Sequence, residues 1–551
     1  MNLRLTWVQP EDLIGHELRQ AAEDGRDAAG IARRWQSAGG HPAPPSAGAS
    51  SAPAPPGLRA LATRLLDELA ALPGRSAAHE PTDLPSIRAS CPDWPEPAAS
   101  DPAPGQAPPP PHGEAFAGDG PDLPPGSFEP ANARDGAPAS GAARRPTHAS
   151  PGGPTPGRTA GGGTEAPRTR AAGATSPHGE AHAAKAPGVQ GRDRAEWGDD
   201  PLLHRLHAAW LGRAAGCLLG KPVEKLPLHA IRALARATDN WPLTTWFTAK
   251  GVPAELLAAH PWNRRSAATS LAENIDGMPE DDDLNYPLLN LLLLQRYGHG
   301  FRTCDVARLW LDELPAGRTF TAERIAFRNL LAGLEPPLTA ARHNPFREWI
   351  GAAIRADVHG WTHPGDPAAA AAQAHRDATL THTANGVYGA MFVAAALADA
   401  ATGTADVHRC LRTGLRVVPP RSRLAEAVRF GIETATAHPG FDDVVDRLHA
   451  AYGTYHWVHM IPNTALLAAA LTHADGDFTG SICRAVSGGW DTDSTGATAG
   501  SLAGLLAGDP DRLPERWTAP LKNRLATTVA GFDGTGFDSL AHLTFQEVVR
   551  P

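Results

Sequence analysis

The chain has few of the features that mark secreted or membrane proteins. Its 551 residues include five cysteines, which are scattered along the sequence and form no Cys-x-x-Cys pair. An odd number of isolated cysteines indicates a reducing compartment and not a disulfide framework. No apolar stretch reaches the ~20 residues of a membrane span, and no basic start followed by an apolar run marks a secretory signal. We therefore expect a cytoplasmic protein that makes no contact with a membrane.

An excess of positive charge is also absent. Lysine and arginine together number 50 against 59 aspartates and glutamates, which gives a formal net charge of −9. Nucleic-acid binding requires a basic patch, and the arginines in the middle of this chain are too dispersed to form one. We therefore do not expect nucleic acid as a partner.

Large apolar residues are almost missing from the middle of the chain. Between Asp101 and Arg194 they are only Phe116, Leu123, Phe128 and Val189, in a background of Pro, Gly, Ala, Ser and Thr. Such a segment cannot bury enough apolar surface to offset the entropy of ordering it. We predict a disordered linker at 93–196, between a small N-terminal region at 1–92 and a larger domain at 197–551.

The two flanking regions both have helical patterns. Within 1–92, leucines repeat at helical spacing from Leu58 to Leu72, and an amphipathic segment runs from about Asp12 to Trp35. Two helices form a poor core, so this region should dock on the larger domain or meet a partner. The larger domain shows Ala- and Leu-rich segments between Gly and Pro breaks, without alternating β-branched residues. The predicted fold class is all-α.

The most informative motif is Gly-Gly-Trp-Asp-Thr-Asp-Ser-Thr-Gly-Ala at residues 488–497. It places Asp491, Asp493 and Ser494 at the start of a predicted helix. Glycine then recurs at every fourth position from 496 to 508, which forms a narrow face that allows another helix to approach closely. The acidic residues could simply cap the helix. A calcium-binding EF-hand loop is excluded because its twelfth position, which needs a bidentate Glu, is Leu502.

A second acidic cluster, Glu280 to Asp283, directly precedes an apolar helix predicted at 284–294, with Pro287 in its first turn. Consecutive acidic residues usually form a solvated face. Here the buried helix would carry them toward the core, where carboxylates need a cation.

A third element has glycines at 212, 216 and 220, followed by Glu224 with the same spacing. Pro222 predicts that the helix stops near Gly220, so Glu224 would lie in the loop that follows. The simpler interpretation is a helix-packing stripe with Glu224 at the surface.

Together, these three motifs resemble those of the ADP-ribosylglycohydrolase family, and the resemblance spans residues 199–551. It implies an all-α domain that holds two magnesium ions between the two acidic motifs. The implied metal ligands are Asp281, Asp282, Asp283, Asp491, Asp493 and Ser494. An alternative register for the first motif would begin at Glu280. The chain departs from the family at Cys217, where most members have Asp, and at Phe392, where many have Arg.

Ligands that are all oxygen atoms favour Mg²⁺, with Mn²⁺ as the other candidate. The resemblance implies that Glu224 assists proton transfer, while Asp282 or Asp493 could activate the attacking water. It also suggests that Asn385, Gly386 and Tyr388 bind substrate. That segment could instead be only the first turn of the next helix.

The expected function is magnesium-dependent hydrolysis of an N- or O-glycosidic bond that joins ADP-ribose to a protein side chain or a small molecule. The expected partner is such an ADP-ribosylated protein or conjugate. A non-catalytic ADP-ribose-binding or structural protein is the alternative, and a metal phosphohydrolase would use the same ligands. Five aspartates gathered in one site favour the enzyme.

Overall fold

The computed structural model describes residues 8–43, 47–50, 52–96 and 200–550. Within these ranges the chain forms α-helices and short 3-10 turns, and its β structure is limited to two isolated bridges. The predicted all-α fold class is confirmed. The predicted disordered linker lies outside the described residues, apart from 93–96. No helix in the described ranges is long and apolar enough to cross a membrane.

The N-terminal region contains four helices, α1 (Pro10–Glu23), α2 (Ala29–Ser37), α3 (Pro56–Ala70) and α4 (Leu84–Ser90). The amphipathic segment predicted from 12 to 35 is thus two helices and not one. The break falls at Gly25, whose φ of +69° is a left-handed conformation that glycine adopts without strain. Helix α3 buries Leu65, Leu66 and Leu69, as the leucine spacing predicted.

Buried ion pairs join this region to the larger domain. The Arg347 guanidinium contacts Glu17 at 2.9 Å and Asp24 at 2.8 Å, and Arg423 contacts Glu80 at 2.7 Å. The described residues on both sides of the gap belong to one compact unit. Of the two alternatives for the N-terminal helices, docking on the larger domain is the one observed.

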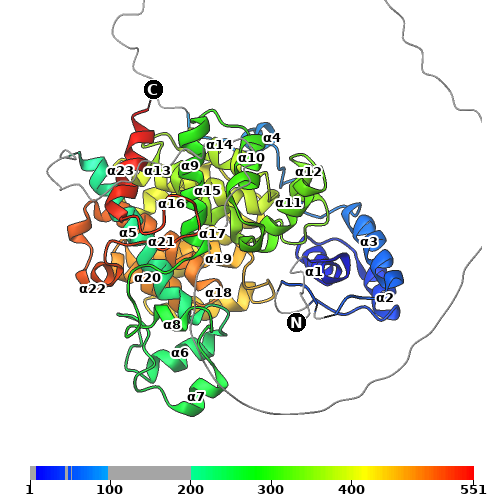
Figure 1. The fold of residues 1–551 in the computed structure, drawn as a ribbon, viewed down its shortest axis with the longest axis horizontal. Helices are drawn as coiled ribbons and strands as arrows, with labels where there is room; N and C mark the ends of the chain where they lie inside the picture. The colour runs from blue at the N-terminus through cyan, green and yellow to red at the C-terminus, as the bar shows by residue number, and fades with distance from the viewer. Residues whose placement is uncertain (1–7, 44–46, 51, 97–199, 551) are drawn as a thin grey trace, which may run out of the picture. The chain divides into compact units, whose positions relative to one another are not determined.

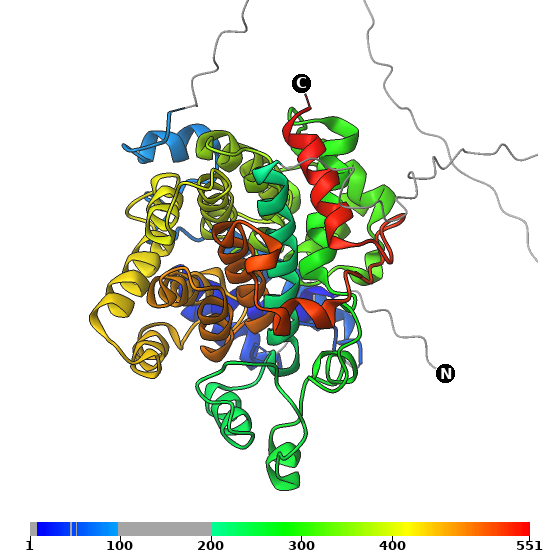
Figure 2. The same cartoon turned by 90° about the vertical axis from the view of Figure 1, so that its left-hand side faces the viewer.

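The larger domain is built from many helices around a few buried ones (Figures 1 and 2). In chain order these are α5 (Pro201–Gly220), α6 (Leu228–Arg236), α7 (Ala254–Ala259), α8 (Ala267–Ser270), α9 (Asp282–Tyr297), α10 (Thr303–Glu313), α11 (Thr321–Leu331), α12 (Leu338–Ala341), α13 (Asp357–Trp361), α14 (Pro367–Ala378), α15 (Ala384–Ala400), α16 (Val407–Arg416), α17 (Arg423–Ala437), α18 (Phe441–Tyr452), α19 (Met460–Ala474), α20 (Phe478–Ser487), α21 (Thr492–Ala507), α22 (Glu515–Thr518) and α23 (Phe537–Val548). The 3-10 turns between these helices include η2 (Lys221–Val223) and η4 (Ile350–Arg355).

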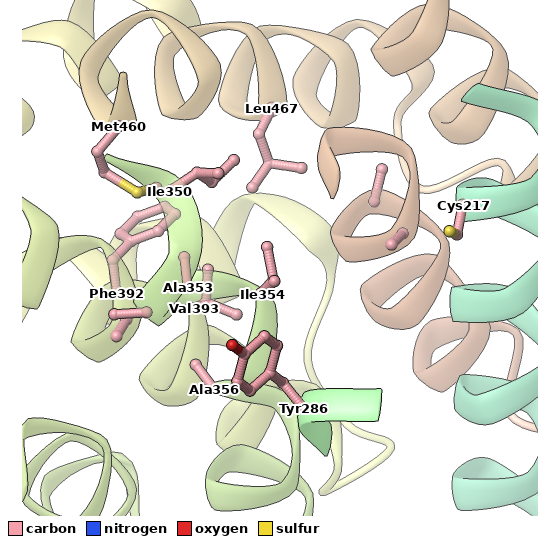
Figure 3. Close-up of a cluster of buried hydrophobic side chains, with 14 of the residues drawn as sticks. Cys217, Tyr286, Ile350, Ala353, Ile354, Ala356, Phe392, Val393, Met460 and Leu467 are labelled. Carbon is pink, nitrogen blue, oxygen red and sulfur yellow. The ribbon is translucent and has the colours of Figure 1, made fainter. Parts of the chain in front are cut away.

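Helices α15, α19 and α21 are buried along nearly their whole length. Their sequences are rich in Ala and other small residues, so they pack as a central group. Figure 3 shows part of this core, in which Ile354 of η4, Phe392 of α15 and Leu467 of α19 come together. Cys217 of α5 lies at one side of the same region.

The closest helix contact in the domain is between α5 and α21, and it is made by their glycine stripes. A Cβ on Gly216 would lie 1.9 Å from the carbonyl oxygen of Gly496, and one on Gly212 would lie 2.1 Å from that of Gly500. Real Cβ atoms do not approach backbone atoms this closely, so only glycine fits at these positions. The stripe that the sequence predicted as a close-approach face thus packs against the second glycine stripe of the same chain.

This contact also brings the end of α5 close to the start of α21, and acidic residues lie next to both of these helix ends. Gly220, at the end of α5, lies against the backbone of Thr492, at the start of α21. The Thr492 hydroxyl donates a hydrogen bond of 2.8 Å to the carbonyl oxygen of Gly220. At the opposite end, Gly504 lies against Ala208, so the helices run antiparallel. The loop after α5 therefore meets the first turn of α21.

Replacing Gly500 with alanine should destabilise the protein by roughly 1–3 kcal/mol or more, because the new methyl would lie 2.0 Å from the Gly212 oxygen. Gly57→Ala is the matched control, since this exposed helical glycine has no atom within 4 Å of the added carbon. The free energy of unfolding of the Gly57→Ala variant should stay constant or rise by roughly 0.5–1 kcal/mol. Urea unfolding followed by circular dichroism measures both, and equal effects would contradict the packing described here.

Candidate functional site

The loop before α21 has an unusual backbone. Gly489 and Trp490 both adopt positive φ, +81° and +59°. For tryptophan this conformation is uncommon and needs support from its surroundings. The Trp490 ring stacks on His449 at a centroid distance of 4.0 Å and an interplanar angle of 6°, and His449 is itself hydrogen bonded to the Gly488 carbonyl. These contacts stabilise the sharp turn that delivers Asp491.

Asp491 is the N-cap residue of α21, yet its side chain does not cap the helix. Its backbone N–H instead donates to the Asn463 side-chain oxygen at 3.1 Å, and the Thr495 hydroxyl donates to the same oxygen at 3.2 Å. The Asn463 amide nitrogen donates to two carbonyls, those of Trp457 and His459. Asn463 therefore fixes the loop and leaves the Asp491 carboxylate available.

The acidic triplet lies at the start of α9. Asp281 is the N-cap, and its carboxylate accepts a hydrogen bond of 2.9 Å from the N–H of Asp283. The helix begins at Asp282, so Pro287 lies in its second turn. The prediction that Pro287 lies in the first turn is wrong. Proline has no N–H, so the Asp283 carbonyl lacks its usual helical donor. The Arg213 Nε donates to this carbonyl at 2.8 Å, which explains how proline is tolerated there.

Arg213 is a residue that the sequence analysis missed. It is fully buried, and its guanidinium contacts the carboxylates of Asp283 at 3.3 Å and Asp357 at 2.9 Å. The only signal in the sequence is an arginine that lies between Gly212 and Gly216 of the glycine stripe in α5. Since a buried charge must be paired, that position alone indicated a carboxylate partner. It could not show which one.

The candidate ligand atoms fall into two groups. The first group comprises Cys217, Asp281 and Asp283, whose sulfur and oxygen atoms lie within 4.8 Å of one another. Burial would raise the pKa of Asp281, but its buried ion pair with Lys221 outweighs this and holds the pKa below its ordinary value. Burial, together with Asp281 and Asp283, raises the pKa of the Cys217 thiol well above its usual range. The thiol is therefore neutral.

The second group comprises Glu224, Asp491 and Asp493, again with ligand atoms within 4.8 Å of one another. Glu224 accepts a hydrogen bond of 2.6 Å from the Asn263 amide and pairs with Lys225 at 2.6 Å. Burial and the nearby Asp493 raise the pKa of Glu224 to about 7. Burial and neighbouring carboxylates likewise raise the pKa of Asp491 and of Asp493. The cluster thus holds repelling charges at close range.

Among the described residues, Asp282 and Ser494 belong to neither of these two groups. Ser494 connects the two acidic motifs, because its hydroxyl donates to Asp283 at 3.2 Å. Asp282 is half-buried, and burial followed by the charge of Asp281 raises its pKa well above the ordinary value. Glu280, the start of the alternative register, pairs with Arg318 at 3.1 Å and Asn285 at 2.9 Å, both outside the two groups.

The second group fits a hard divalent cation. Its donors are all carboxylate oxygens, of which those of Asp491 and Asp493 are buried and that of Glu224 is partly buried. Lys225, which pairs with Glu224, has a side chain that is 52% exposed. Bringing three carboxylates together in a buried place is unfavourable unless protons or a cation neutralise them. The first group has a thiol and two basic partners, so it fits such a cation less well.

The residues predicted to bind substrate have other partners. The Asn385 amide donates to Glu348 at 2.9 Å, and its oxygen accepts from the N–H of Leu424 at 3.0 Å. The Tyr388 hydroxyl donates to the Pro81 carbonyl of the N-terminal region. A Cβ on Gly386 would lie 2.5 Å from a backbone oxygen, so this glycine serves close packing. Their role in binding substrate stays a prediction.

The chain is similar to known proteins. The model of the ADP-ribosylglycohydrolase family matches residues 199–548. An uncharacterized protein of Archaeoglobus fulgidus is 26% identical over 316 residues, which are 57% of this chain and 90% of that protein. A solved structure of an ADP-ribosylglycohydrolase-related protein complex is 21% identical and covers 63% of this chain and 99% of its own, with a TM-score of 0.39.

The raised pKa of Glu224 predicts a pH effect in metal-free buffer. Its folded-state pKa of about 7 exceeds the ordinary 4.5, so the folded state binds the proton more tightly and loses stability as pH rises between these values. Glu224→Gln removes this loss. The free energy of unfolding of the variant, compared with that of wild type, should therefore be higher at about pH 8 than at about pH 5, by on the order of a few kcal/mol.

Chemical denaturation in EDTA at the two pH values measures this difference. Glu433→Gln, an exposed substitution in α17, is the control and should follow the wild type at both. A Glu224→Gln curve that stays parallel to the wild type would show that Glu224 is not buried among repelling charges.

Proposed function

Because the chain belongs to the ADP-ribosylglycohydrolase family, we propose that it is a metal-dependent hydrolase that releases ADP-ribose from a protein side chain or a small molecule. The observation that carries this proposal is the group of Glu224, Asp491 and Asp493. Two buried carboxylates and a partly buried one meet there, within 4.8 Å of one another, at the junction of α5 and α21. A structural protein gains nothing from this arrangement, which is unfavourable without a cation.

These three side chains would hold a hard divalent cation, Mg²⁺ or Mn²⁺. When bound, such an ion supplies Lewis-acid chemistry suited to hydrolysis. The protein supplies the geometry. Asn463 fixes the backbone of Asp491 at 3.1 Å, and Asn263 holds the Glu224 carboxylate at 2.6 Å, so the ligands are oriented before any ion binds.

Asp282 is the residue that we assign to proton transfer. It is half-buried, lies in the first turn of α9, and is not committed to either ligand group. Burial and the neighbouring Asp281 raise its pKa, which makes its carboxylate a stronger base than that of an ordinary aspartate. Its side-chain oxygen would take a proton from the attacking water. Glu224, first expected to serve this purpose, is better suited to hold the cation.

The function is tested by incubating the full chain with Mg²⁺ and peptides that carry ADP-ribose on arginine or serine. Wild-type protein should release free ADP-ribose from one of them. Asp282→Asn should lower kcat by roughly 10²–10⁴-fold, as expected for loss of a general base, without weakening metal binding. Asp312→Asn, an exposed substitution in α10, is the control and should retain full activity.

Asp493→Asn should lose metal binding and activity together. ADP-ribose binding without release from either peptide would support the binding protein instead. Release at full rate in EDTA would contradict the metal dependence.

A further inference from the structure

The two ligand groups are neutralised in different ways. We propose that the Lys221 ammonium is a built-in cation of the first group, so that the site holds one divalent cation, at Glu224, Asp491 and Asp493, instead of the two expected from the family resemblance. This inference rests on the proposed function. It concerns how many ions this particular chain binds, and where.

Lys221 is held in place by the end of α5. It directly follows Gly220, and its backbone N–H donates to the carbonyl of Cys217, one helical turn earlier. The next residue, Pro222, continues the chain as a 3-10 turn. Side chains four residues apart lie on one face of a helix, so the thiol and the ammonium point to the same side. Gly220 itself touches the backbone of Thr492, which fixes this end of α5 against α21.

The Lys221 side chain is only 8% exposed, as is that of its partner Asp281. Burial alone would lower the pKa of Lys221, but the charge of Asp281 raises it above the ordinary value. The buried ion pair with Asp281 thus places the ammonium inside the site. A divalent ion bound to Asp281 would leave this ammonium buried without its anion, which is strongly unfavourable.

The other members of the first group also have partners that disfavour a hard cation. Asp283 is contacted by the buried guanidinium of Arg213 at 3.3 Å, which it shares with Asp357, and by the Ser494 hydroxyl at 3.2 Å. Cys217 contributes sulfur, a soft donor that hard cations disfavour. A second hard dication would thus meet two buried basic side chains and a soft donor in this half.

The second group is different. Its ion pair joins Glu224 to Lys225 at 2.6 Å, and the Lys225 side chain is 52% exposed. An exposed lysine can leave its partner and remain solvated, whereas a buried one cannot. The negative charge that remains on Asp491 and Asp493 therefore attracts the cation to this half only.

The experiment counts metal ions on the full chain, with Mn²⁺ as the probe, by equilibrium dialysis and elemental analysis. Wild type should bind one Mn²⁺ per chain, and its electron paramagnetic resonance spectrum should lack the exchange coupling of a Mn²⁺ pair. Lys221→Met frees Asp281 and should raise the count toward two. Lys522→Met, which removes an exposed lysine from Asp276, is the matched control and should leave the count at one.

Two variants locate the ion independently of Lys221→Met, which could fail to fold. Asp493→Asn should abolish Mn²⁺ binding, whereas Asp281→Asn should keep one ion. Two coupled ions in the wild type, or loss of the ion in Asp281→Asn but not in Asp493→Asn, would overturn the proposal and leave the hydrolase function standing. No Mn²⁺ bound by the wild type would overturn the metal-dependent function as well.

Discussion

The backbone contact between α5 and α21 is the constraint on which the candidate site depends. Glycines on both helices allow the two backbones to meet where any Cβ would collide with a carbonyl oxygen. Because the helices are antiparallel, the end of α5 lies against the start of α21. Glu224 and Lys221 are thereby delivered to Asp491 and Asp493. If the two helices lay further apart by the thickness of a side chain, these charged side chains would no longer be close to one another.

Electrostatic compensation divides the resulting cluster in two. Basic side chains that are themselves buried, Arg213 and Lys221, face Asp283 and Asp281. In the other half, Glu224 pairs with the exposed Lys225, next to Asp491 and Asp493. Since buried charges must be paired, the uncompensated half is the one that demands a cation from solution. The departures from the family pattern around Cys217 thus affect the chemistry of the site and not the fold.

Glu348 links the larger domain to the N-terminal helices. This buried carboxylate accepts hydrogen bonds from Arg423, from Asn385 and from Gln20 of α1. Burial opposes its ionisation, but Arg423 outweighs that effect and lowers its pKa well below the ordinary value. The N-terminal region and the start of α15 therefore both form hydrogen bonds with the charged Glu348 side chain. The Tyr388 hydroxyl contacts Pro81 of the N-terminal region, whereas the Asn385 side chain contacts Glu348 and Leu424 of the larger domain. Their role in binding substrate stays a prediction.

The sequence by itself determined the helical class, the two glycine stripes and the acidic motifs at helix starts, because these depend on local periodicity and capping. It also indicated a family whose model matches residues 199–548. It did not reveal that the two stripes pack on each other, that Pro287 lies in the second turn of α9, or that Arg213 satisfies the carbonyl thereby left free. Arg213 and Asp283 are 70 residues apart. Only the tertiary structure decides which buried charges meet, because pairing depends on the distance between elements, and no local pattern encodes that distance.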